Sequence, residues 1–151
     1  MKFTTQKLRL FLLFKLPAAF FTGVRVKSID ENVAVVGVKH RWINQNPFNS
    51  IYFAVLTMAA ELATGVLVLK KIHTTRARIS SLITKQSAEF TKKARGVIRF
   101  TCDNGKIIDE KIEAALTSRE GQVFVLRSIG LDEQGDQVAS FEFEWSIKVK
   151  A

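Results

Sequence analysis

The pattern of apolar and polar residues is dominated by one long apolar stretch, residues 51–69, in which Glu61 is the only charged residue. A helix on a protein surface shows a polar face, whereas a helix that is apolar on all sides is enclosed by protein or by lipid. Pro47 cannot continue a helix from upstream, and Asn49 and Ser50 can cap one. The pattern therefore predicts a long central helix that begins at this Asn-Ser pair.

Small and polar residues share one side of this helix, and Glu61 lies in the middle of the seam that they form. At about 100° per residue, the seam comprises Ser50, Ala54, Thr57, Glu61, Thr64 and Gly65. A substrate channel has such a lining, which favours a functional carboxylate. The alternative is a structural carboxylate, held by an arginine or by backbone donors. Apolar surroundings are expected to raise the pKa of Glu61.

Runs in which apolar and polar residues alternate predict strands on both sides of the central helix. They cover residues 24–29 and 33–42 before it, and 78–90, 96–102, 123–129 and 138–149 after it. The last run is the clearest, because Phe141, Phe143 and Trp145 alternate with polar residues. Strands with one apolar face form an antiparallel sheet that packs this face on another element. The central helix is that element.

Two further helices are expected beside the sheet. Residues 1–21 mix Lys and Arg with Leu and Phe, which predicts an amphipathic helix that ends near Pro17 and packs on the domain. A helix in peripheral contact with a membrane surface is the alternative. The run of five consecutive apolar residues in this segment is too short for the h-region of a secretory signal, which needs about 7–15. A short second helix fits residues 107–118.

Length and composition limit the class of protein. With 151 residues, we expect one domain over residues 22–151, preceded by the helix of residues 1–21. A single cysteine, Cys102, favours a reducing compartment, and we expect a cytoplasmic protein. The net charge of +9 indicates an anionic partner, but no nucleic-acid-binding motif accompanies it, so nucleic acid is not expected. His40 and His73 lack partners at ligand spacing, so no metal site is expected.

The start of the central helix resembles the hotdog superfamily. Its small thioesterases carry an Asn, a Gly three residues on, His-Gly-Gly three residues further, and an Asp or Glu nine residues after the His. Asn46 matches the Asn, Asn49 stands at the Gly, the Tyr-Phe-Ala of residues 52–54 stands at His-Gly-Gly, and Glu61 falls on the acid. The substitution of Tyr-Phe-Ala removes the glycines that let a substrate carbonyl approach the helix closely.

A second match supports the same resemblance. Residues 89–96 look like the Phe-x-x-Pro-Ala-x-Gly turn of the superfamily, with Lys93 where Pro is usual. The resemblance covers residues 24–149. It implies an α+β hotdog fold, in which an antiparallel sheet wraps around a long central helix, here with an N-terminal helix and a short second helix.

The resemblance also implies hydrolysis of an acyl-CoA or acyl-carrier thioester, with coenzyme A as part of the substrate and no other cofactor. Such hydrolysis needs a carboxylate that activates water or attacks the carbonyl, and Glu61 can supply it. It also needs donors to the oxyanion, and the free N–H groups at the helix start, around Tyr52, Phe53 and Ala54, can supply these. Asn46 and Thr64 complete the candidate catalytic residues.

One chain cannot bring these two groups together. Tyr52 and Glu61 are nine residues apart, which corresponds to about 13–14 Å along a helix. Two antiparallel helices related by a two-fold axis can bring each Glu61 to the partner's helix start. We therefore expect a homodimer or a tetramer.

The basic turn after the third predicted strand supplies candidate phosphate ligands. Lys92, Lys93 and Arg95 can meet the phosphates of coenzyme A or an acidic carrier protein, or form a solvated rim. Two other classes of function compete with hydrolysis. One is a non-catalytic acyl-CoA or lipid-binding module on the same fold. The other is a small membrane protein that uses residues 51–69 as a span, since about 20 residues cross a bilayer.

Overall fold

The computed structural model describes residues 3–151 of the chain. The first two residues of the expected N-terminal helix lie outside this range. The elements in chain order are α1 (Thr5–Lys15), α2 (Pro17–Phe21), β1 (Arg25–Ile29), β2 (Ala34–Lys39), a 3₁₀ helix (Trp42–Asn44), α3 (Phe53–Thr74), β3 (Ile79–Phe90), β4 (Val97–Cys102), α4 (Gly105–Ser118), β5 (Gln122–Leu131) and β6 (Gln137–Val149).

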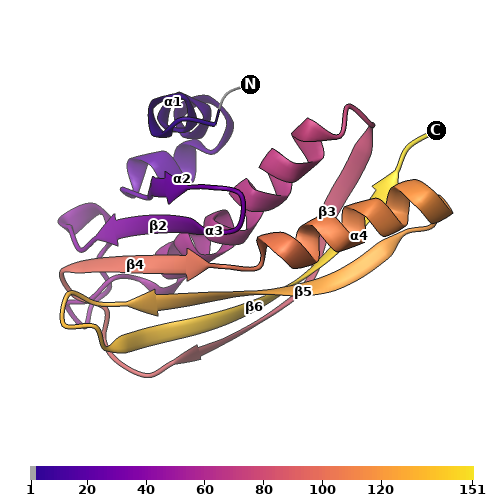
Figure 1. Ribbon diagram of the computed structural model, residues 1–151. Helices are drawn as coiled ribbons and strands as arrows, with labels where there is room; N and C mark the ends of the chain where they lie inside the picture. The colour runs from indigo at the N-terminus through magenta and orange to yellow at the C-terminus, as the bar shows by residue number, and fades with distance from the viewer. Residues whose placement is uncertain (1–2) are drawn as a thin grey trace.

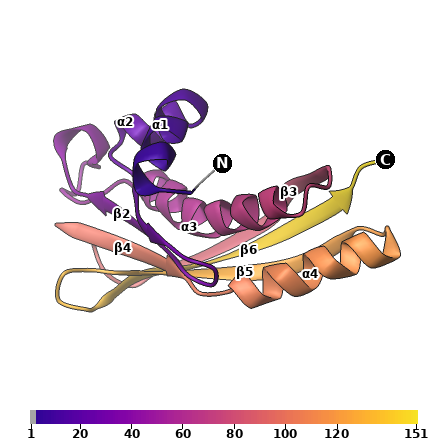
Figure 2. The same ribbon diagram turned by 45° about the horizontal axis from the view of Figure 1, so that its top comes forward.

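The six strands form one sheet in which each neighbouring pair is antiparallel, in the order β1-β2-β4-β5-β6-β3. The sheet curves around α3, while α1 and α2 lie at the β1 end and α4 lies beside β5 (Figures 1 and 2). β1 and β3 are the two edge strands. The predicted α+β hotdog architecture, with a long central helix, an N-terminal helix and a second helix after the fourth strand, is confirmed.

The inner face of the sheet is the face that the alternation in the last strand predicts. Phe141, Phe143 and Trp145 of β6 are buried, and the rings of Phe141 and Phe143 stack with centroids 5.7 Å apart. Burial of an aromatic side chain removes about 150–250 Å² from water. These rings therefore contribute much of the apolar area that holds the sheet on α3.

α3 is the core helix, and half of its 22 residues are buried. It is long and apolar enough to cross a membrane, and 56% of its apolar window is buried within the protein. The sheet covers one of its sides, and Leu8 and Leu12 of α1 join the same core. An apolar helix needs such an enclosure, and here protein supplies it.

The start of α3 differs from the prediction. The helix begins at Phe53 rather than at residue 50, because Asn49 and Ser50 belong to a turn instead of a cap. The side-chain Oδ1 of Asn46 accepts from the backbone N–H groups of Phe48 and Ser50, at 2.9 and 3.3 Å. Asn49 has a left-handed φ of 56°. The turn held by Asn46 thus includes Asn49 and Ser50, the two residues that were expected to cap the helix.

α3 also ends later than predicted, at Thr74 instead of near residue 69. Lys70 and Lys71, which follow the apolar stretch, therefore lie inside the helix. Lys70 pairs with Glu31 at 2.6 Å, and the buried Lys71 pairs with Asp109 of α4 at 2.6 Å. These ion pairs come from distant parts of the chain, so the local pattern does not contain them.

The N-terminal segment forms two helices rather than one. α1 ends at Lys15, and Pro17 starts α2, where its fixed φ and missing N–H suit the first helical position. The second predicted strand is shorter than expected and ends at Lys39. It stops because the Asn44 side chain donates to the carbonyls of Lys39 and Thr22, each at 2.9 Å, and turns the chain there.

Candidate functional site

Glu61 lies on α3 between two hollows. The first, which we call the apolar cavity, has a volume of about 210 Å³ and lies between α1 and α3. Its lining comprises Leu8, Phe11, Leu12, Leu16, Val26, Glu61, Leu62, Gly65, Val66, Val68, Leu69, Ser81 and Trp145. The second, the β3 cavity, measures about 340 Å³ and is lined by Thr57, Met58, Glu61, Ile83, Gln86 and Phe143.

The Glu61 carboxylate is half-buried and has no partner within residues 3–151: none of the hydrogen bonds or ion pairs there reaches its oxygens. Burial raises the pKa of Glu61 from 4.5 to about 7. A structural anion is normally paired or hydrogen-bonded, because an unpaired buried charge is costly. The Glu61 carboxyl can therefore be half ionised near neutral pH, and the described residues 3–151 supply none of the arginine or backbone donors of the structural alternative.

Gly65 has no side chain and so leaves space for the Glu61 carboxylate. A Cβ atom at Gly65 would lie 2.8 Å from Glu61 Oε1 and 3.6 Å from the Trp145 ring. The carboxylate thus folds back over Gly65, one helical turn further on, and the Trp145 ring lies near the same glycine. A side chain at position 65 would displace it.

Thr64 supports this arrangement from behind. Its hydroxyl donates to the Glu61 carbonyl at 2.8 Å and accepts from Trp145 Nε1 at 3.2 Å. Thr64 is fully buried and lines neither hollow beside Glu61. Its hydroxyl orients the tryptophan, which is a positioning role.

The start of α3 borders a third hollow, the helix-start cavity, of about 520 Å³. Its lining comprises Asn46, Pro47, Phe48, Ser50, Ile51, Tyr52, Phe53, Leu56, Phe90, Thr91, Lys92, Lys93 and Ala94. The Tyr52 N–H is occupied, because it donates to the Asn44 carbonyl at 2.8 Å. Within the described chain, the N–H groups of Phe53 and Ala54 have no acceptor. Of the three expected donors, Tyr52 is therefore occupied, and Phe53 and Ala54 remain.

Asn46 holds the loop that leads into α3. Besides the two bonds that shape the turn, its Nδ2 donates to Ser50 Oγ at 3.0 Å and to the Ile51 carbonyl at 3.4 Å. Ile51 in turn donates its N–H to the Ala94 carbonyl at 2.8 Å. Asn46 therefore fixes where the helix begins and joins the loop to the basic turn.

The basic turn has less free charge than the sequence suggests. Lys92 Nζ pairs with Asp132 at 2.6 Å and Asp136 at 2.8 Å. The hydrogen bonds of these carboxylates raise the pKa of Lys92. Lys93 Nζ lies 5.9 Å from the Phe48 ring, and Arg95 Nε donates to the Asn49 carbonyl at 3.0 Å. Of the three cations in the basic turn, Lys93 and Arg95 are thus the two without a carboxylate partner within residues 3–151.

Within one chain, the two halves of the candidate site are separate. None of the hollows described here is lined by both Glu61 and Phe53. The apolar residues of α1 that wall the apolar cavity were missed by sequence reasoning. The apolar face of the N-terminal helix could have indicated this wall. The sequence pattern does not show, however, which part of the domain that face covers. No group of three or more His, Cys, Asp or Glu that could hold a metal occurs in residues 3–151.

The family described as Domain of unknown function (DUF4442) matches residues 5–147. Among solved structures, the chain is similar to a protein of unknown function from Pseudomonas aeruginosa described as a probable thioesterase. The TM-score is 0.82 and the identity 21%, over 97% of both chains. A thioesterase from Haemophilus influenzae gives a TM-score of 0.73 at 11% identity, over 99% of this chain and 93% of that one.

A further similar structure is a variant of a thioesterase enzyme from Staphylococcus aureus, with a TM-score of 0.64 at 14% identity. The match covers 83% of this chain and 93% of that one. No curated protein matches the chain in sequence. At these identities, the structural likeness establishes a shared thioesterase-type fold.

Proposed function

We propose that this chain, which belongs to the DUF4442 family, hydrolyses an acyl thioester of coenzyme A or of an acyl-carrier protein. The observation that carries the proposal is Glu61, an unpaired carboxylate with its pKa raised to about 7, at the wall of an apolar cavity. A general base is most effective when its pKa lies near the working pH. The thioesterase-type fold of the relatives agrees with this chemistry.

The apolar cavity suits the acyl chain. Apart from Glu61, Ser81 and the Trp145 indole, its lining is aliphatic or aromatic, and α1 supplies Leu8 and Leu12 as one wall. A ligand pocket is typically apolar with a few polar groups that fix the orientation of the ligand. Glu61 at its edge would then face the carbonyl end of the acyl group.

The reaction proceeds through a tetrahedral intermediate. Glu61 takes a proton from water, and the water oxygen bonds to the thioester carbon while the carbonyl electron pair moves to oxygen. When the intermediate collapses, the carbon–sulfur bond breaks and the thiolate takes the proton from the Glu61 carboxyl. The products are a carboxylic acid and a thiol. The N–H groups of Phe53 and Ala54, at the positive end of the α3 dipole, stabilise the oxyanion.

This site requires two copies of the chain, since Glu61 lies about 10–12 Å along α3 from the N–H groups of Phe53 and Ala54. The edge strand β3 supports such an assembly. It is 12 residues long, pairs only with β6 within the described chain, and is largely exposed. Long open edges invite pairing with another strand. Because Ile83 and Gln86 of β3 border the β3 cavity, a second copy at this edge would approach Glu61.

Exposed aromatic side chains at the helix start agree with a covered surface in the assembly. Phe48, Tyr52, Phe53 and Phe90 are between 48% and 70% exposed, and all four line the helix-start cavity. Exposed apolar clusters of this kind mark interaction sites. Light scattering is expected to give a dimer or a tetramer, and a monomer of 17.0 kDa would remove the composite site.

A non-catalytic acyl-ligand binding module is the second candidate. It is favoured by the Asn44 carbonyl, which occupies the Tyr52 N–H and leaves fewer donors for an oxyanion. A hydrolysis screen over acyl-CoA chain lengths, with the free thiol as the readout, separates the two. For a hydrolase, Glu61→Gln lowers kcat by about 10²–10⁴-fold, the range for general-base catalysis, and leaves acyl-CoA binding intact.

The matched control for this substitution is Glu110→Gln, on the exposed face of α4. It makes the same chemical change away from the three hollows and should hydrolyse as the wild type does. Binding of acyl-CoA by the wild type without release of thiol at any chain length would favour the binding module.

A further inference from the structure

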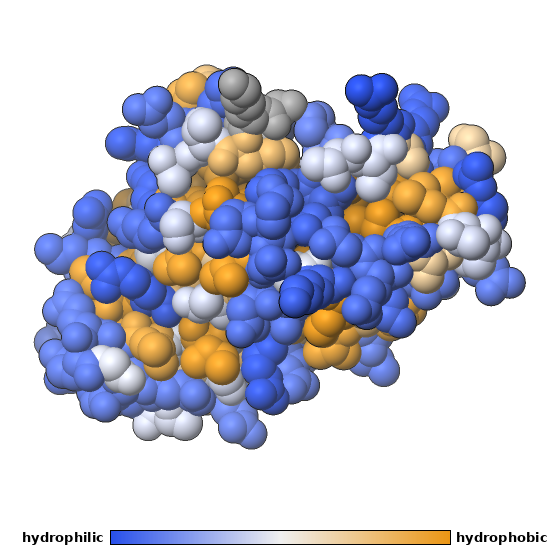
Figure 3. Space-filling model, in the orientation of Figure 1, coloured by the Kyte–Doolittle hydropathy of each residue, from blue (hydrophilic) through white to orange (hydrophobic). Residues whose placement is uncertain are grey.

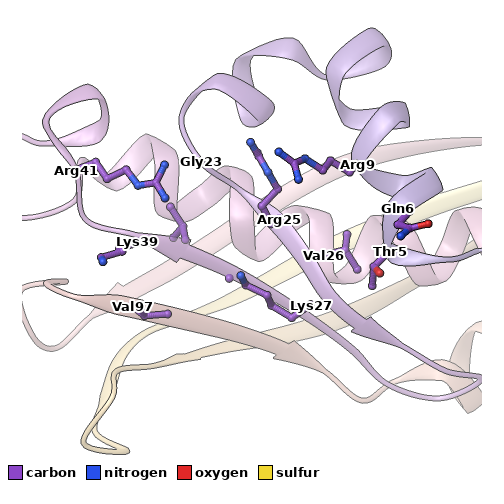
Figure 4. Close-up of a pocket in the computed structure, with 12 residues that line it drawn as sticks. Thr5, Gln6, Arg9, Gly23, Arg25, Val26, Lys27, Lys39, Arg41 and Val97 are labelled. Carbon is purple, nitrogen blue, oxygen red and sulfur yellow. The ribbon is translucent and has the colours of Figure 1, made fainter.

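A fourth hollow lies on the opposite edge of the sheet from β3. This basic cleft has a volume of about 490 Å³ and lies between α1 and the outer face of β1, β2 and β4 (Figure 4). Twelve residues line it: Thr5, Gln6, Arg9, Gly23, Arg25, Val26, Lys27, Gly37, Val38, Lys39, Arg41 and Val97. Five of these side chains are cationic and none is acidic. Hydrophilic residues cover the middle of this face in Figure 3.

The five charges of the basic cleft are not neutralised by protein. None of Arg9, Arg25, Lys27, Lys39 and Arg41 has an ion pair within residues 3–151. Instead they repel one another: burial, followed by the like charges of Arg9 and Arg41, lowers the pKa of Arg25 from its ordinary value. Arginine nevertheless stays protonated in proteins. The positive potential of the cleft is therefore available to a ligand.

Glu133 lies near the edge of the basic cleft at Val97, but it does not neutralise the cations of the cleft. Glu133 Oε1 accepts from the backbone N–H of Val97 at 3.1 Å. It therefore serves the end of β4 and pairs with none of the five cations. The acids of the turn between β1 and β2 are also engaged elsewhere, since Glu31 pairs with Lys70 and Lys71.

Arg25 is held in a fixed orientation at the centre of the cleft. Its Nη1 donates to the carbonyls of Phe20 and Val24, each at 2.7 Å, and its guanidinium carbon lies 4.0 Å from the centre of the Phe20 ring. A guanidinium has five N–H donors, so others remain for a ligand. Figure 4 shows Arg9 of α1 beside Arg25, with Arg41 directed toward them from the loop after β2.

The floor of the cleft is shaped for a lysine. A Cβ atom at Gly37 would lie 2.6 Å from Lys27 Cε, so the Lys27 stem lies flat across β2 at this glycine. Lys39, two residues along β2, is exposed on the same side. One hollow thus collects cations from α1, β1, β2 and the loop after β2. Lysines scattered over a solvated surface would not gather in this way.

We propose that the basic cleft binds the phosphate groups of an anionic ligand, with Arg9, Arg25 and Arg41 as its principal donors. Guanidinium groups bind phosphate oxygens through paired hydrogen bonds, and several together neutralise a multiply charged group. The ligand chemistry has two sources, a soluble phosphorylated compound or a phospholipid headgroup. The inference is independent of the proposed hydrolysis, because the cleft does not include Glu61, shares no lining residue with the helix-start cavity and shares only Val26 with the apolar cavity.

The first test uses inorganic pyrophosphate as the probe and calorimetry as the readout. The wild type is expected to bind pyrophosphate more weakly as salt is raised. The double variant Arg9→Glu/Arg41→Glu should weaken binding by about tenfold or more. Lys106→Glu/Lys150→Glu, on exposed residues outside the cleft, makes the same change in net charge and should retain most of the affinity. If the double variant does not fold, Lys39→Glu alone tests the same cleft.

The second arm separates the sources. Vesicles of phosphatidylcholine, alone or with an equal part of phosphatidylglycerol, are sedimented with the protein. α1 carries Leu10 and Phe14, which are 58% and 76% exposed, beside Arg9. If the source is a headgroup, binding to the anionic vesicles falls in both Arg9→Glu/Arg41→Glu and Leu10→Ser/Phe14→Ser. If the source is soluble, pyrophosphate binds and the Leu10→Ser/Phe14→Ser variant binds it unchanged.

Three results would overturn the assignment. The wild type could bind neither probe, the cleft variant could bind both probes as the wild type does, or the control pair could lose as much affinity as the cleft pair. Binding of a single-stranded oligonucleotide without binding of either phosphate probe would equally contradict it. Each outcome is independent of whether thioesters are hydrolysed.

Discussion

Glu61 and Gly65 are one helical turn apart on α3, and the glycine leaves the space into which the Glu61 carboxylate folds: a Cβ atom at Gly65 would stand 2.8 Å from Oε1. The close atom is the far end of a flexible side chain, so a larger residue at position 65 moves the carboxylate rather than the backbone. This relationship allows the position of the base to be changed without changing its chemistry.

Gly65→Ala is therefore expected to separate stability from activity. Alanine is favoured over glycine inside a helix by about 1 kcal/mol, so the melting temperature should rise or stay the same. Thioester hydrolysis should fall, because the new methyl group pushes the carboxylate out of its position over residue 65. Melting and turnover measured on the same sample check this. Unchanged turnover would mean that the position of the Glu61 carboxylate is irrelevant to the reaction.

The pH dependence of stability tests the environment of Glu61. Its pKa is raised from 4.5 to about 7, so between these pH values the folded chain binds more protons than the unfolded one. Stability due to this group is therefore present at low pH and is lost as the pH rises through 7. Glu61→Gln does not titrate, and we expect it to be more stable than the wild type above pH 7 by about 3 kcal/mol.

Denaturant unfolding of the wild type and Glu61→Gln at several pH values measures this difference. The two proteins should converge in stability below pH 4.5, where Glu61 is protonated in both states. If Glu61 were instead a structural anion, the glutamine variant would be the less stable protein at neutral pH, by several kcal/mol.

Thr64→Val tests the positioning role of the threonine. The substitution keeps the shape of the side chain but leaves the buried Trp145 Nε1–H without its acceptor, at 3.2 Å in the wild type. We expect a loss of about 1–3 kcal/mol in unfolding free energy. Hydrolysis should fall, but far less than in Glu61→Gln, because the hydroxyl lines neither hollow beside Glu61 and acts only through the orientation of the Trp145 indole. A loss of kcat comparable to that of Glu61→Gln, with unchanged stability, would make Thr64 a catalytic residue instead.

The elements that the sequence predicted well are those fixed by local periodicity. The alternation around Phe141 and Phe143 identified β6 and its buried face, and the all-round apolar character of residues 53–69 identified the core helix. Glu61 stood out for the same reason, as the one charge in that helix. Patterns of this kind depend on neighbouring residues, and a single sequence contains them.

The features that the sequence did not predict are fixed by residues far apart in the chain. Asn44 takes the Tyr52 N–H, and Asp109 holds Lys71 inside a helix that was expected to end earlier. Lys92 is neutralised by Asp132 and Asp136, some 40 residues on. The basic cleft likewise collects cations from α1, β1, β2 and a loop. Only the folded chain brings such groups together. The composition therefore predicted a net positive charge, but not where on the surface the cations gather.

The central claim is that Glu61 of one chain acts with the helix start of another, and mixed dimers test it. Phe53→Pro removes one oxyanion donor while keeping the helix, because proline suits the first helical position and Tyr52, at ψ 134°, has the extended backbone that precedes proline. Glu61→Gln removes the base. Each variant alone should be nearly inactive.

Unfolding the two variants together and refolding them as a mixture should restore activity. A mixed dimer has one intact site, made by Glu61 of the Phe53→Pro chain and the Phe53 N–H of the Glu61→Gln chain. Random assembly makes half of the dimers mixed, so the account predicts about a quarter of the wild-type specific activity. A mixture no more active than the two variants measured apart would contradict it.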